Sequence, residues 1–132
     1  MPIELGLKGH AECLVTPELT AAAVGSGSLE VFSTPSMIAL IEKAALTSLL
    51  PFLEPGQSTV GTRLDVAHSA ATPLGMTVWA ESEVTEVERR RVVFAVRAYD
   101  EAGLIGEGTH ERFLVDAEKF MAKCAAKTAP KN

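Results

Sequence analysis

The sequence is poor in aromatic residues, in cysteine and in clustered positive charge, and each shortage excludes a class of function. One Trp, one Tyr and five Phe in 132 residues offer no platform for stacking bases, and a formal charge of -5 gives no basic field for a phosphate backbone. Nucleic acid is therefore not an expected partner. Cys13 and Cys124 lie far apart, with no CxxC spacing and no clustered histidines, so we expect no disulfide framework, no metal and no cofactor.

Long apolar runs are also missing. None approaches the roughly 20 residues that a membrane-spanning helix needs, and Met1–Leu5 lacks the basic and apolar parts of a secretory signal. We therefore expect no membrane partner and a cytoplasmic location. The length predicts a single domain over residues 1–132. One small domain has no interdomain cleft, which favours a site at a subunit interface.

Turn residues and apolar periodicity divide the chain into a strand, a loop, a helix and four further strands. Residues 6–15 alternate loosely and predict the first strand, and the Gly- and Ser-rich residues 21–28 predict a mobile loop, a candidate lid. Residues 35–50 predict a helix with Thr34 as its cap and Pro35 at its first position. Because this helix is apolar nearly all round, we expect it to be buried.

Four extended segments follow, at about 58–70, 76–87, 91–100 and 104–115, and their short links predict antiparallel pairing between neighbours. Alternation puts one set of side chains on an apolar face: Val60, Leu64, Val66 and His68. Residues 116–127 predict a short amphipathic helix. An antiparallel sheet wrapped around one apolar helix is the α+β hotdog arrangement, and its remaining apolar faces predict a homodimer or a larger assembly.

Glu42 stands out because the stripe of helix on which it lies is apolar one turn before and one turn after it. Glutamate is almost never fully buried without a partner, and an unpaired carboxylate there would be costly. The catalytic interpretation makes Glu42 a general base or nucleophile whose basicity is raised by desolvation. The structural alternative places it at the edge of the helix beside Lys43, where it reaches solvent.

His68 and Thr34 are the other candidates. His68 ends a strand on its apolar side, where an imidazole can reach a pocket and still meet water, and the alternative is an ordinary core histidine. Thr34 is placed to cap the helix, but its hydroxyl can also serve a substrate. Eight residues separate Thr34 from Glu42, about 12 Å along a helix. Either the helix begins later than Thr34, or the two side chains meet across a dimer interface.

Several segments from about residue 31 to the carboxyl terminus form a joint pattern: Val31-Phe32-Ser33-Thr34, the apolar helix around Glu42, residues 51–56, Val60-Gly61-Thr62, and residues 68–76, 105–112 and 118–120. Together they resemble the fluoroacetyl-CoA thioesterase family of hotdog proteins. The resemblance implies hydrolysis of acyl-CoA with Thr34, Glu42 and His68 as the catalytic set. It also implies that Gly61 lets the backbone approach the acyl group and that Arg112 lies near the acyl pocket. A solvated strand charge is the alternative for Arg112.

The segment before the helix departs from the family pattern. Fluoroacetyl-specific members have a longer, aromatic lid with a phenylalanine gate, and the matching position here is about Ser28, in a Gly-Ser stretch. We therefore expect Ser28 to contact the substrate and the enzyme to accept several small acyl-CoAs. A hotdog enoyl-CoA hydratase is an alternative, but such enzymes pair an aspartate with a histidine five positions on, where Asp65 is followed by Ala70. A non-catalytic acyl-CoA-binding module is a second alternative.

Overall fold

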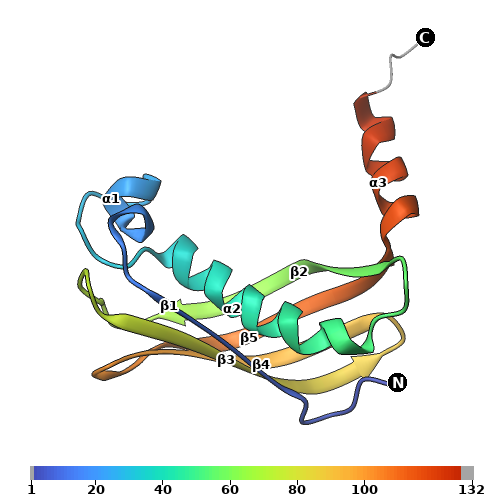
Figure 1. The fold of residues 1–132 in the computed structure, drawn as a ribbon, viewed down its shortest axis with the longest axis horizontal. Helices are drawn as coiled ribbons and strands as arrows, with labels where there is room; N and C mark the ends of the chain where they lie inside the picture. The colour runs from blue at the N-terminus through green and yellow to red at the C-terminus, as the bar shows by residue number, and fades with distance from the viewer. Residues whose placement is uncertain (1, 129–132) are drawn as a thin grey trace.

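The computed structural model describes residues 2–128 and has the predicted hotdog fold. Its antiparallel sheet contains β1 (Lys8–Leu14), β2 (Gln57–His68), β3 (Thr77–Glu88), β4 (Arg91–Asp100) and β5 (Gly103–Asp116). The α-helices are α1 (Ala21–Val24), α2 (Thr34–Leu49) and α3 (Ala117–Ala125), and short 3-10 turns lie at Pro17–Leu19, Leu50–Phe52 and Ala126–Thr128. Figure 1 shows α2 lying along one face of the curved sheet, whereas α3 stands away from the sheet beyond the end of β5.

The strand order is β1-β3-β4-β5-β2, which confirms the β3–β4 and β4–β5 hairpins but not a β2–β3 pair. β2 pairs with β5 instead, so the prediction that all neighbours pair is wrong at this link. The reason lies in the link between β2 and β3, which pairs with the segment before α2. The Phe32 amide donates to the Thr72 carbonyl, and Val31 forms a bridge with Pro73. Both edges of β3 are taken by β1 and β4, and β2 becomes an edge strand.

A bulge in β2 decides which of its side chains face α2. Gly61 is registered with Arg112 and Leu64 with His110, so Thr62 is the extra residue between them. Val60 and Leu64 consequently face opposite sides, and their expected placement on one face is wrong. The Thr62 hydroxyl donates to the Glu111 carboxylate over 2.7 Å, which holds the bulged residue to β5.

Helix α2 begins one residue earlier than expected. Ser33 is the cap, because its extended backbone lets its hydroxyl accept from the Ser36 amide over 3.1 Å. The prediction that Thr34 caps the helix is therefore wrong. The helix is also not buried all round: its buried residues are Met37, Leu40, Ile41, Ala44, Ala45, Ser48 and Leu49, and its exposed stripe contains Ala39, Lys43 and Thr47.

The predicted aperiodic loop at residues 21–28 is partly helical. Thr20 caps α1 by accepting from the Ala23 amide, and Gly25 ends the helix with a left-handed backbone at φ 81°. The Ala21 amide also donates to the Val31 carbonyl, so this segment folds back onto itself before α2. The expectation of an irregular loop is therefore wrong for residues 21–24. No helix within residues 2–128 has both the length and the apolar character needed to cross a membrane.

Candidate active site

Thr34 and His68 meet at the amino-terminal end of α2. Thr34 is the first residue of that helix, and His68 is the last residue of β2. The Thr34 Oγ1 and His68 Nδ1 atoms lie 2.8 Å apart, within hydrogen-bond distance. Because Ser33 caps the helix, the Thr34 hydroxyl is left free for this contact. Two of the three predicted catalytic residues are thus brought together by elements that are distant in the sequence.

The imidazole of His68 keeps unused hydrogen-bonding capacity. Its Nε2 atom is buried and has no partner within residues 2–128. Burial lowers the pKa of His68 below its ordinary value of 6.5, so the neutral ring, which can accept a proton, is favoured at neutral pH. A cleft of about 260 Å³ adjoins the pair, with a lining of Ala21, Ser26, Val31, Phe32, Ser33, Thr34, His68, Ser69, Ala70 and Ala71.

Glu42 belongs to a second cluster, two turns further along α2. Arg112 Nη1 donates to Glu42 Oε2 over 3.2 Å. Gly61 lies directly beneath this contact, since a Cβ atom added to it would stand 2.5 Å from Glu42 Oε2. The missing side chain of Gly61 therefore gives room to the carboxylate.

Arg112 is buried, with 5% of its surface exposed, so the reading of it as a solvated strand charge is wrong. Its Nε donates to Thr59 Oγ1 over 2.9 Å, and its Nη2 donates to the Thr59 carbonyl over 3.1 Å. Nη1 lies 3.2 Å from His110 Nε2 as well as from Glu42. Burial lowers the pKa of Arg112, and the Glu42 carboxylate opposes that shift. The guanidinium is therefore a fixed charge that points at Glu42.

In the single chain Glu42 lies outside the dry pocket expected for it. Its side chain is 38% exposed, and the imidazole in its cluster is that of His110, not of His68. Because α2 begins at Thr34, a later start of the helix is excluded, and about 12 Å of helix separates Thr34 from Glu42. The other alternative, a meeting across a dimer interface, stays a prediction.

Sequence reasoning missed His110 and Thr59, which hold Arg112 in place. A signal existed, because Gly106, Gly108, His110 and Arg112 alternate along β5 and share the face turned to α2. Two polar residues on an inward face indicate a buried network. Ser28, by contrast, is exposed in the segment between α1 and α2, where Ser26 lines the cleft instead.

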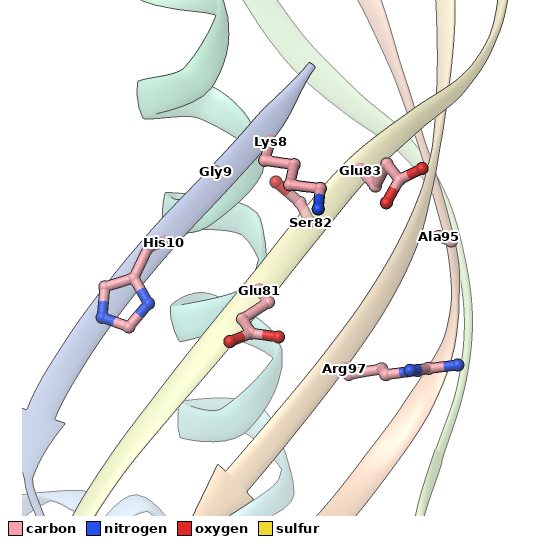
Figure 2. A pocket seen from close by; sticks show the side chains of 8 residues that line it. All are labelled: Lys8, Gly9, His10, Glu81, Ser82, Glu83, Ala95 and Arg97. Carbon is pink, nitrogen blue, oxygen red and sulfur yellow. The ribbon is translucent and has the colours of Figure 1, made fainter. Parts of the chain in front are cut away.

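A larger hollow, of about 570 Å³, lies on the other side of the sheet (Figure 2). Lys8 and His10 come from β1, Glu81 and Glu83 from β3 and Arg97 from β4, with charges of both signs. None of the predicted catalytic residues lines this hollow. Within residues 2–128, no three His, Cys, Asp or Glu side chains gather in a way that could hold a metal ion.

Comparisons with known proteins identify the family of the chain. The family model described as fluoroacetyl-CoA-specific thioesterase matches residues 15–118. A curated protein named fluoroacetyl-CoA thioesterase, from Streptantibioticus cattleyicolor, is 46% identical over 99 residues, which is 75% of this chain and 71% of that protein.

Solved structures give the same picture. A structure of the fluoroacetyl-CoA thioesterase FlK superposes with a TM-score of 0.91 at 36% identity, covering 98% of this chain and 100% of the other. A thioesterase superfamily member from Thermus thermophilus superposes with a TM-score of 0.88 at 33% identity, covering 96% and 93%.

Proposed function

The chain belongs to the fluoroacetyl-CoA-specific thioesterase family and is an acyl-CoA thioesterase, and we propose that it cleaves small acyl-CoAs with Thr34, Glu42 and His68. The observation that carries this assignment of residues is the 2.8 Å contact between Thr34 Oγ1 and His68 Nδ1 beside a cleft. A neutral imidazole that bonds to a hydroxyl, and whose other nitrogen has no partner among residues 2–128, is suited to moving a proton.

Two copies of the chain would complete the site. β2 is a 12-residue edge strand, and an exposed edge favours pairing with another strand. If two β2 strands pair antiparallel about a two-fold axis between Leu64 and Asp65, Gly61 of one copy lies opposite His68 of the partner subunit. The Glu42 cluster of one subunit then approaches the Thr34–His68 pair of the other. Leu64, which is 39% exposed in the single chain, would lie at this interface.

In the composite site each group has one task. Either the Glu42 carboxylate attacks the thioester carbonyl and displaces the CoA thiolate, after which water hydrolyses the acyl-Glu42 anhydride, or Glu42 takes a proton from a water molecule that attacks the carbonyl. In both routes His68 accepts a proton that originates from this water and delivers it to the CoA thiolate. Thr34 orients the acyl group or the carboxylate. Oxygen-18 found in Glu42 after a single turnover in labelled water would show direct attack, because water that opens the anhydride at the Glu42 carbonyl leaves its oxygen in that carboxylate.

The preference among acyl groups follows from the segment before α2. Ser28 stands near the position of the phenylalanine gate in fluoroacetyl-specific members, and it is exposed and small here. We therefore expect kcat/KM for acetyl-CoA and fluoroacetyl-CoA to agree within about tenfold, since a pocket without a specific contact discriminates weakly. A preference for fluoroacetyl-CoA of a thousandfold or more would contradict this broad specificity.

Release of free thiol from acetyl-CoA tests the assignment of residues. Glu42→Gln and His68→Ala should each lower kcat by about 10²- to 10⁴-fold, the usual contribution of a general acid or base. Thr34→Ala should lower kcat less, and Thr47→Ala is the matched control, because Thr47 is exposed on the same helix and bonds to backbone carbonyls of that helix. Wild-type kcat in Glu42→Gln would exclude Glu42 as the reacting carboxylate.

Mixing two inactive variants tests the composite site. Glu42→Gln and His68→Ala subunits, unfolded and refolded together, should form mixed dimers in which one of the two sites has both native residues. Random assortment makes half of the dimers mixed, so roughly a quarter of wild-type activity should return. If each site lies within one subunit, mixing will restore nothing.

A further inference from the structure

His110 lies at the centre of the network behind Glu42, and the catalytic set does not include it. Its side chain comes from β5, is 1% exposed and faces α2. The ring stacks on Phe94 of β4 with 6.0 Å between centroids. Its nitrogens lie near two groups of opposite character: Nδ1 is 2.9 Å from the Arg63 carbonyl oxygen, and Nε2 is 3.2 Å from Arg112 Nη1.

These two neighbours determine where the proton of His110 resides. A carbonyl oxygen can only accept, so Nδ1 must carry the hydrogen, and a guanidinium can only donate, so Nε2 must present its lone pair. The ring is therefore neutral, with its tautomer set by the fold. Burial is the main cause that lowers the pKa of His110, and the charge of Arg112 lowers it further. Glu42 on α2 and Glu111 on β5 act in the opposite direction.

Through Nε2, His110 restrains the end of Arg112 that meets Glu42. The other nitrogens of the guanidinium are held by Thr59, as described above, whereas Nη1 is shared between His110 and Glu42 at 3.2 Å each. The Glu42 side chain is more than one third exposed, so its position depends on this buried charge more than on packing. Loss of the Nε2 acceptor would let the guanidinium tilt and would shift the carboxylate with it.

We propose that His110 is a positioning residue of the thioesterase, whose neutral Nε2 holds Arg112 so that Arg112 fixes the Glu42 carboxylate. The inference rests on the proposed role of Glu42 in the reaction. It adds a requirement that the catalytic set does not contain, namely a hydrogen-bond acceptor at the Nε2 position of residue 110. A histidine present only for packing against Phe94 would need no such acceptor.

Two amide variants separate these roles. In His110→Gln the amide oxygen can reach the place of Nε2 and accept from Arg112, whereas in His110→Asn the shorter side chain reaches only toward the Arg63 carbonyl. We expect His110→Gln to keep kcat within about threefold and His110→Asn to lose about 10- to 100-fold in kcat with little change in KM, as misplacement of a reacting group does. Equal loss in both variants, or no loss in either, would overturn the proposal.

The tautomer of His110 in the wild-type protein can be read without any variant that might misfold. Nitrogen-15 NMR at pH 7 should show a neutral ring protonated on Nδ1, and the Nε2-protonated form or an imidazolium would overturn the inference. Glu42→Gln in the same thiol-release assay keeps the two hypotheses apart. If Glu42→Gln is active, the proposed role of Glu42 fails; if it is inactive while the two amide variants behave alike, only the role of His110 fails.

Discussion

The two clusters along α2 are built in opposite ways. At the beginning of the helix, Thr34 and His68 share a hydrogen bond beside a cleft, and the other imidazole nitrogen has no partner in the described part of the chain. Two turns later, Arg112 is buried and makes contacts with three side chains and a backbone carbonyl. Both clusters contain a histidine whose pKa is lowered by burial.

The difference corresponds to two tasks in a hydrolytic site. A group that transfers protons needs a free lone pair and an open approach. His68 offers both, because its Nε2 has no partner within residues 2–128 and a cleft adjoins it. A charge that orients a carboxylate needs fixed partners, which Arg112 has, because a preorganised dipole or charge is not required to rearrange during the reaction. We call the Thr34–His68 pair the open cluster and the Arg112 network around Glu42 the closed cluster. Under the proposed function, the open cluster transfers protons and the closed cluster orients the carboxylate.

Among variants that leave both clusters' polar side chains in place, the largest effect is expected from Gly61→Ala, which crowds the Glu42 carboxylate. The new methyl group would stand 2.5 Å from Glu42 Oε2 and 3.2 Å from His110 Cε1, so the carboxylate must move by about 1 Å. Such a displacement lowers kcat by roughly 10²-fold. Steady-state kinetics with acetyl-CoA, together with the thermal unfolding midpoint, measures it.

The same variant separates two uses of the space above Gly61. If the glycine serves the carboxylate, kcat falls and KM changes little. If it serves the acyl group, as the family resemblance implies, KM rises and kcat is retained. The second result would mean that Gly61 makes room for the substrate and not for the Glu42 carboxylate.

A smaller effect, a change in the pKa of His68, is expected if the two clusters approach each other in the proposed dimer. A carboxylate within about 4–6 Å favours the charged imidazole, so the partner subunit's Glu42 should raise the pKa of His68 above the value that burial alone produces. In Glu42→Gln this opposing influence is lost, and the pKa of His68 should fall.

NMR titration of the His68 ring protons measures this shift. Glu54→Gln is the control variant, because Glu54 is exposed and follows the carboxyl-terminal end of α2, so it should leave the titration curve of His68 unchanged. Identical His68 curves in wild type and Glu42→Gln would mean that the clusters stay apart in the assembled protein. The lowered pKa of His68 also affects stability. Because the unfolded chain binds a proton on His68 more readily than the folded protein does, the free energy of unfolding should decrease as the pH falls below 6.5.

Local sequence patterns predicted most of the helices and strands, because helix and strand periodicity depends on residues that are close together in the sequence. Long-range pairing was harder. The turn-like link after His68 predicts a hairpin between β2 and β3, yet β2 pairs with β5. The link itself is bonded elsewhere, because the Thr72 carbonyl accepts from the Phe32 amide. The bulge at Thr62 depends on Glu111 of β5, and no pattern within β2 indicates it.

Within the candidate site, Glu42 and His68 could be selected because each is polar in an apolar stretch. Arg112 was placed near the pocket only by the family resemblance, and its own sequence context left a solvated strand charge open. Its burial depends on Thr59, His110 and Glu42, which come from three different elements. Its role becomes evident only when β2, β5 and α2 are assembled. The choice of helix cap was ambiguous for a local reason: Ser33 and Thr34 are adjacent, both are good caps, and Pro35 fits either the first or the second helical position.

The smallest effects are expected at the adjacent residues Ser33 and Thr34. They test whether one hydroxyl stabilises the helix while the other takes part in the reaction. Ser33→Ala removes the cap of α2 and should cost about 1 kcal/mol of unfolding free energy, with kcat changed less than about twofold. Thr34→Ala removes the hydroxyl bonded to His68 and should lower kcat while leaving stability within about 0.5 kcal/mol. Urea unfolding and thiol release on both variants give the comparison. If Thr34→Ala is the destabilised variant and Ser33→Ala the inactive one, the hydroxyl of Thr34 supports the helix and does not take part in the chemistry.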